Sequence, residues 1–96
     1  MKKAKFYTLT QKNRKKIARK HEGYTDGTFN YYRGEYGTWF AIEPNTGMSV
    51  CSDVLLKIVS ARAHNMLETI EGIKDKEYYK NCVKLFQKLT ESEDRQ

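Results

Sequence analysis

The fold is decided by residues 24–51, YTDGTFNYYRGEYGTWFAIEPNTGMSVC, in which aromatic residues are dense and turn residues recur. Seven aromatic residues fall within the seventeen positions from Tyr24 to Phe40. Aromatic side chains favour strands, whereas Gly34 and the PNTG tetrad at 44–47 are typical of turns. We therefore expect three strands, at about 28–33, 37–43 and 47–51, joined as an antiparallel meander.

The segment after this stretch has apolar residues at helical spacing. We expect a helix that Ser52 or Asp53 caps and Gly72 ends, with a second helix beginning near Asp75. The inward residues of the first helix are expected to be Leu55, Val59, Ala63, Met66, Leu67 and Ile70. Those of the second are expected to be Tyr78, Tyr79, Cys82, Val83, Phe86 and Leu89.

The segment before the aromatic stretch begins with a motif typical of a helix start. Residues 8–11, TLTQ, fit a capping box, so the sequence predicts a helix from Leu9 that stops at Gly23. Only Leu9, Ile17 and Ala18 are apolar within it, and cations cover the remainder. Residues 1–8 are expected to be an N-terminal arm or an edge strand.

Together these elements predict a single α+β domain over residues 1–96. The expected architecture is an N-terminal basic helix, a three-stranded antiparallel meander, and two C-terminal helices packed on one face of the sheet. Residues 91–96 are expected to form a frayed tail.

Positive charge is concentrated at the N-terminus. The chain carries 18 Lys and Arg against 12 Asp and Glu, a net charge of +6. Residues 1–20 hold nine of these cations and no acid. Such a cluster attracts phosphate backbones, although a Lys-rich run also serves as a solvated, solubilising stretch.

The candidate binding residues combine these cations with nearby tyrosines. Tyr32 and Tyr36 lie beside the Gly34 turn, where we expect exposure, whereas Phe29, Trp39 and Phe40 are expected in the core. Cations contact phosphates and exposed aromatic rings stack on unpaired bases. The predicted site, for a nucleic acid or an acidic partner, is therefore Lys12, Arg14, Lys15, Lys16, Arg19, Lys20, Arg33, Tyr32 and Tyr36.

Catalytic and metal motifs do not occur in the chain. The spacing of Cys51, Cys82, His21 and His64 fits no zinc site, and we expect the cysteines to be reduced. His64 is interpreted as half-buried and structural, and His21 as a cap at the C-terminus of the first helix. We expect no metal, no cofactor and no enzymatic activity.

Hydropathy gives no segment near the ~20 apolar residues that a spanning helix needs. The N-terminus also lacks the apolar run of a secretory signal. We therefore expect a cytoplasmic protein that does not enter membranes.

Three short resemblances do not identify a family. The predicted order over residues 9–71 resembles a double-stranded-RNA-binding domain, but SDVLLK at 52–57 replaces its Lys-Lys-x-Ala-Lys run. Residues 39–42, WFAI, resemble the second strand of sheet-reading DNA-binding domains of plant transcription factors and of some phage and transposon integrases. Residues 33–36, RGEY, are similar to a strand of ribosome-dependent messenger-RNA interferase toxins, but Gly37 replaces its second Arg.

Three functional hypotheses follow from the charge layout and the absent motifs. The first is a small non-enzymatic protein that binds nucleic acid or a nucleoprotein. The second is a stoichiometric protein inhibitor or adaptor, such as an anti-CRISPR-like anti-defence protein of a phage or mobile element. The third is an RNase-like toxin. The partner's identity, the choice between RNA and DNA, and the oligomeric state stay open.

Overall fold

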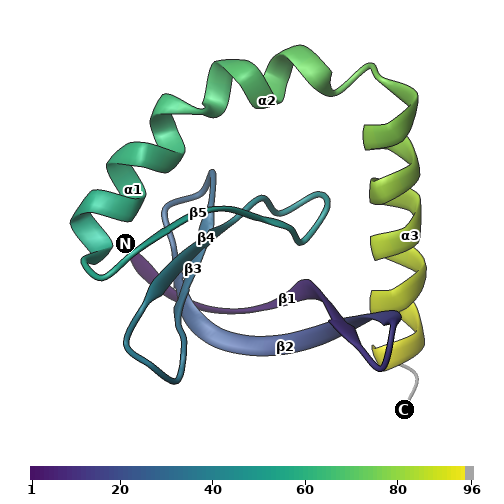
Figure 1. The fold of residues 1–96 in the computed structure, drawn as a ribbon, viewed down its shortest axis with the longest axis horizontal. Helices are drawn as coiled ribbons and strands as arrows, with labels where there is room; N and C mark the ends of the chain where they lie inside the picture. The colour runs from purple at the N-terminus through teal and green to yellow at the C-terminus, as the bar shows by residue number, and fades with distance from the viewer. Residues whose placement is uncertain (95–96) are drawn as a thin grey trace.

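A five-stranded antiparallel sheet followed by three helices makes up the computed structural model, which describes residues 1–94 (Figure 1). The strands are consecutive neighbours in the sheet. Their bounds are β1 (Lys2–Lys12), β2 (Lys15–Thr25), β3 (Asn30–Arg33), β4 (Trp39–Ile42) and β5 (Ser49–Asp53). The helices are α1 (Leu56–Asn65), α2 (Leu67–Ile73) and α3 (Glu77–Asp94). The chain is thus a small single-domain α+β protein, but the predicted N-terminal helix and the count of three strands are wrong.

A long β-hairpin replaces the helix predicted from Leu9. β1 and β2 pair along their full length, from Lys2 opposite Thr25 to Lys12 opposite Lys15. Asn13 and Arg14 both have positive φ, 52° and 67°, which is the geometry of a tight two-residue hairpin turn. The cationic positions therefore follow a period of two rather than the helical period of 3.6. Of the alternatives for residues 1–8, β1 is an edge strand.

The meander of β3, β4 and β5 is present in the predicted order. Each strand is shorter than or equal to its predicted length, and the pairing of β4 with β5 shifts register between Ala41 and Ile42. The turn between them returns to the first strand, because the Leu9 N–H donates to the Gly47 carbonyl at 2.8 Å. This bond draws the β4–β5 turn onto β1 and partly closes the sheet.

The main core lies between the sheet and the first two helices. Tyr31 and Ala41 from the sheet pack with Val59 and Ala63 of α1, and all four are fully buried. We call the side of the sheet that carries Tyr31 and Ala41 the helix face. Phe29 and Ile70 complete the cluster of buried residues.

The helix predicted after residue 53 is divided in two at Met66. The Met66 N–H donates to the Ala63 carbonyl, a tight turn that ends α1. Val59, Ala63 and Ile70 are buried as predicted, but Leu55 and Met66 are 56% and 37% exposed. Leu55 lies outside the helix as its N-cap, and Met66 lies in the break between α1 and α2, so neither belongs to the single predicted stripe.

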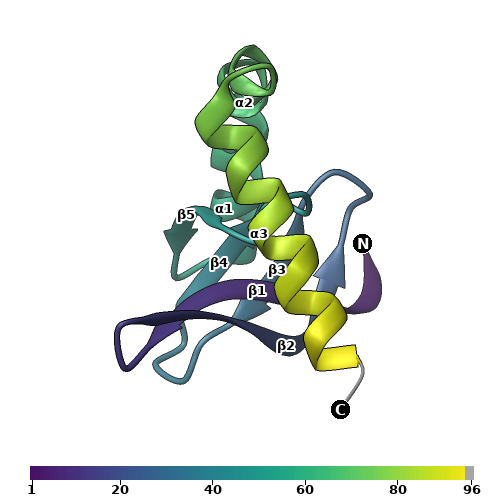
Figure 2. The ribbon, with the colours of Figure 1, turned by 90° about the vertical axis from the view of Figure 1, so that its right-hand side faces the viewer.

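The last helix runs beside the sheet (Figure 2), and buried side chains of α3 hold it there. Tyr79 and Phe86 are buried as predicted, whereas Tyr78 is 59% exposed. The Tyr79 hydroxyl donates to the buried Glu43 carboxylate at 2.9 Å. The expected frayed tail is helical as far as Asp94, and positions 95 and 96 lie outside the described residues.

Membrane insertion by a helix finds no support in residues 1–94. None of the described helices is both long enough and apolar enough to cross a membrane.

Candidate functional site

A stack of aromatic rings stands on the side of the sheet opposite the helix face. We call this side the aromatic face; it carries Phe6, His21, Tyr32 and Phe40. Register places Phe6 opposite His21, and Tyr32 opposite Phe40. The His21 and Tyr32 rings are stacked with 3.9 Å between centroids, and Tyr32 and Phe40 with 5.2 Å. Four neighbouring strands, β1 to β4, therefore each contribute one ring to this aromatic cluster.

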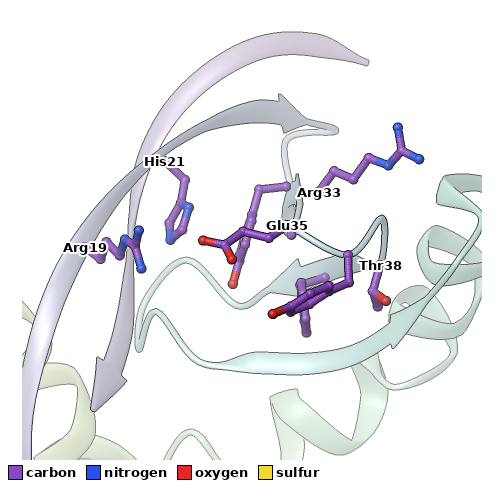
Figure 3. A pocket seen from close by; sticks show the side chains of 9 residues that line it. Arg19, His21, Arg33, Glu35 and Thr38 are labelled. Carbon is purple, nitrogen blue, oxygen red and sulfur yellow. The ribbon is translucent and has the colours of Figure 1, made fainter. Parts of the chain in front are cut away.

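A hollow of about 340 Å³ opens beside this stack (Figure 3). The pairing of β2 with β3 covers only two residue pairs, Tyr24 with Tyr31 and Thr25 with Asn30. β3 and β4 stay paired to the end of β3, so the gap lies between β2 and the β3–β4 turn. The hollow is near the lower end of the ~300–1,000 Å³ range of small-molecule sites. Its lining is Arg19, His21, Tyr32, Arg33, Gly34, Glu35, Tyr36, Thr38 and Phe40.

Charged side chains border the hollow. Arg19 and Glu35 lie at the hollow, whereas the Arg33 side chain extends away from His21 and Glu35 (Figure 3). The Arg33 Nε donates to the Gly37 carbonyl at 3.4 Å, which holds this side chain along the β3–β4 turn. The site therefore offers one permanent cation, Arg19, and one carboxylate, Glu35, beside the rings.

Burial and Arg19 set the charge state of the rings. Burial lowers the pKa of His21, and the Arg19 cation lowers it further. Burial raises the pKa of the Tyr32 hydroxyl, an effect that Arg19 partly opposes. The His21 Nε2 lies 3.0 Å from the Thr8 Oγ1. At neutral pH the stacked rings are therefore uncharged. The predicted role of His21 as a helix cap is wrong: His21 is a strand residue whose side chain bonds across the hairpin to Thr8.

Four of the nine predicted site residues meet at this hollow: Arg19, Arg33, Tyr32 and Tyr36. Tyr36 is 95% exposed, as expected beside the Gly34 turn. Phe40, expected in the core, is only partly buried and belongs to the stack. Phe29 is buried as expected, and Trp39 is partly buried against the core.

The other predicted cations are divided between the two faces of the hairpin. Lys12 and Lys15 pair across the base of the β1–β2 turn, on the same side as Arg19 by alternation along the strands. Arg14 occupies the turn itself. Lys16 and Lys20 alternate to the helix face. The predicted residues therefore do not form one continuous cationic surface.

One cation of the helix face, Lys20, lies over a tyrosine that is bonded to α3. The Lys20 Nζ lies 5.7 Å from the centre of the Tyr7 ring. The Tyr7 hydroxyl donates to the Asp94 carboxylate at 2.6 Å. This hydrogen bond, with burial and the charges of Asp94 and Glu93, raises the pKa of Tyr7.

Sequence reasoning missed three parts of the site: His21, Phe40 and Glu35. A signal for His21 was available, because residues 6, 8 and 10 pair with 21, 19 and 17 if the chain is read as a hairpin about positions 13 and 14. Nothing in the local sequence marks Glu35 as a site residue. Its place at the hollow depends on how the β3–β4 turn is positioned next to the ring stack.

A second polar cluster was also missed, at the opposite end of β3. The Asp26 carboxylate accepts from the Thr28 and Phe29 N–H groups, and from the Tyr31 hydroxyl at 2.6 Å. The His64 Nε2 lies 2.7 Å from the same carboxylate. Burial favours a higher pKa for Asp26, but these hydrogen bonds outweigh it and lower the pKa. His64 is thus exposed rather than half-buried, and it links α1 to the β2–β3 turn.

Other chemistry-bearing groups are isolated from the hollow. Cys51 and Cys82 are free and half-buried, and burial raises the pKa of Cys51. In residues 1–94 no three His, Cys, Asp or Glu side chains gather as a metal site. A separate apolar groove of about 340 Å³ lies between β5, α2 and α3, with Met48, Met66 and Tyr78 among its lining residues.

Comparisons with protein-family models, with curated proteins and with solved structures found no match to this chain. Function therefore has to be inferred from the chemistry of the aromatic face itself.

Proposed function

We propose that this protein is a non-enzymatic binding protein that holds nucleic acid against its aromatic face. The observation that carries the proposal is the position of Arg19, which borders the hollow beside the stacked rings of His21 and Tyr32. A guanidinium next to aromatic rings is the pairing that recognises a phosphate together with its base.

Further cations extend this surface along the hairpin. Arg19 and Lys15 are four residues apart on one strand face, which corresponds to roughly 13 Å at ~3.3 Å per residue. Lys12 lies opposite Lys15, and Arg14 lies in the adjoining turn. A strand that reaches from the hollow toward the hairpin turn meets these cations in succession.

The polar groups near the site support binding rather than catalysis. His21 is neutral at pH 7, since its pKa is lowered, and its Nε2 lies within hydrogen-bond distance of Thr8. The other imidazole, of His64, lies with Asp26 beyond the opposite end of β3. A nucleic-acid partner also agrees with the cytoplasmic location expected from the sequence.

Salt dependence of binding tests this proposal. We expect a labelled single-stranded oligonucleotide to bind with a log K that falls linearly with log salt. Three to five phosphate contacts predict a slope between about −2 and −3.5, at ~−0.7 per phosphate. Fluorescence anisotropy between 50 and 300 mM NaCl measures this slope.

A matched pair of charge variants locates the surface. Arg19→Gln and Lys16→Gln each remove one cation from β2, but the two residues lie on opposite faces. Arg19→Gln is expected to weaken binding and to reduce the slope by about 0.7. Lys16→Gln is expected to have little effect. A flat salt profile, or equal losses in the two variants, contradicts the proposal.

A second candidate is a stoichiometric protein inhibitor or adaptor. Tyr36 supports it, because this side chain is 95% exposed and lies in the same turn as Arg33. Tyr and Arg are enriched among the residues that dominate protein interfaces. Affinity capture from bacterial lysate separates the candidates: a protein partner retained after nuclease treatment and lost in Tyr36→Ala favours the inhibitor.

A further inference from the structure

We infer that the hollow accepts one unpaired guanine of a single-stranded nucleic acid, with the Glu35 carboxylate reading the edge of the base. This inference rests on the proposed function and names the ligand of the same site. The juxtaposition that carries it is the Glu35 carboxylate, a ring stack and the Arg19 guanidinium around one hollow of about 340 Å³.

The stacked rings favour a flat aromatic ligand. Tyr32 lies between His21 and Phe40, with interplanar angles of 19° and 22°. Both faces of the Tyr32 ring are covered by these neighbours, so the ring faces left for an incoming base are the outer ones of His21 and Phe40, which also line the hollow. A base adding to such a stack contributes ~1–3 kcal/mol in single-strand binding. A paired base in a duplex has no free face to offer, so a single strand is required.

The position of Glu35 excludes a phosphate from the middle of the hollow. Among the described residues, Glu35 forms no ion pair, so its carboxylate is not neutralised by Arg19 or Arg33. A carboxylate repels phosphate and accepts hydrogen bonds only. The ligand group in this position must therefore donate hydrogen bonds.

Guanine is the base that best matches a carboxylate. Its N1–H and N2–H groups are adjacent and parallel donors, so both carboxylate oxygens accept. Adenine and cytosine each place a ring-nitrogen acceptor next to their amino group, and uracil flanks its single N–H with two carbonyls. Each therefore sets an acceptor against one carboxylate oxygen, which costs free energy.

Arg19 then holds a phosphate next to the inserted base. It borders the hollow, and Lys15 lies further along the same face of β2. The base is thus selected at the centre of the hollow, and the phosphate on one side of it is neutralised at the rim.

Binding of four labelled RNA heptamers tests this inference. Each is oligouridine with one central residue: guanosine, inosine, adenosine or cytidine. We expect guanosine to bind about tenfold more tightly than adenosine, within the discrimination typical of a bidentate contact. Inosine, which lacks the N2 amino group, is expected to be intermediate. Glu35→Gln should remove the preference, whereas Glu68→Gln, an exposed control on α2, should retain it.

The outcomes separate this inference from the function on which it depends. Equal affinities for all four heptamers, together with a steep salt slope, overturn guanine selection and leave nucleic-acid binding intact. A preference that persists in Glu35→Gln also overturns the assignment of Glu35. Salt-independent or undetectable binding of every heptamer overturns both proposals.

Discussion

The His21 imidazole lies face to face with the Tyr32 ring, with 3.9 Å between centroids and 19° between planes. The two residues belong to β2 and β3 at a point where the backbone pairing of these strands has already ended. Side-chain stacking therefore joins the strands where hydrogen bonds do not. The same divergence of the strands opens the hollow.

Stability is expected to depend on the protonation of His21. Burial and Arg19 lower its pKa below the usual 6.5, so the folded protein resists protonation. The resulting stabilisation is complete above pH 6.5 and is lost as pH falls through the lowered pKa. One proton gives a slope of at most about 1.4 kcal/mol per pH unit.

Urea unfolding of the wild type and of His21→Gln between pH 7.5 and 5.0 measures this dependence. The free energy of unfolding of the variant should decline less steeply below pH 6.5. Parallel curves for the two proteins would show that His21 does not contribute. The comparison isolates His21, because His64 is present in both proteins.

Asp26 is expected to stabilise the β2–β3 turn through its charge. Its carboxylate accepts hydrogen bonds from two N–H groups and from Tyr31, and contacts His64. Asp26→Asn should lower the free energy of unfolding by about 2 kcal/mol at pH 7, as expected for hydrogen bonds to a charged group. Thermal and urea denaturation measure this loss.

The pH dependence of the free energy of unfolding shows whether Asp26 stabilises the turn through its negative charge or only through the shape of its side chain. Because its pKa is lowered from the ordinary 3.8, its stabilisation is present above that pH and is lost as pH falls further. The difference between wild type and Asp26→Asn should therefore stay constant above about pH 5 and shrink as the pH falls below 3.8. Asp75→Asn, at an exposed position before α3, should follow the wild type throughout. A constant difference would argue against the charge.

Gly47 is expected to tolerate no side chain. Its φ is +70°, and a Cβ there would lie 2.3 Å from a Phe86 ring carbon and 2.8 Å from the Leu9 nitrogen. Gly47→Ala should cost about 3 kcal/mol, the sum of a left-handed backbone and an overpacked contact. Gly27→Ala is the control, since Gly27 has φ +89° with nothing within 4 Å.

The glycine control should lose only about 1 kcal/mol, the cost of its backbone conformation. The melting temperatures of both variants decide the comparison. Equal losses would show that Phe86 moves aside and that close approach of α3 does not limit this position.

The extent of sequence-based prediction differed between the two halves of the chain. Val59, Ala63 and Ile70 are buried as their helical spacing predicted, because each contributes to one apolar face. The hairpin of β1 and β2 was missed, since the capping-box pattern at residues 8–11 also fits a strand. Asn13 and Arg14 adopt left-handed backbone that local preference does not favour for Arg.

For the candidate site, the sequence predicted that cations and aromatic residues take part, and it named four of the residues that line the hollow. Arg19, Arg33, Tyr32 and Tyr36 meet as chosen, but through a sheet rather than beside a helix. Glu35 and His21 were outside the prediction because their roles depend on contacts between different strands. Lys16 and Lys20 do not share a face with Arg19, because alternation along β2 turns them to the helix face.

By itself the sequence determined the α+β class, the order of the last three strands, the helical C-terminal half and the excess of cations in residues 1–20. These features follow from residue preferences and spacings that act over a few positions. Only the tertiary structure decided that the N-terminal segment pairs as a hairpin, which cations share a face, and where β2 parts from β3. Those outcomes depend on contacts between distant residues, such as Leu9 with Gly47 and His21 with Tyr32, whose free energy exists only when the whole sheet is assembled.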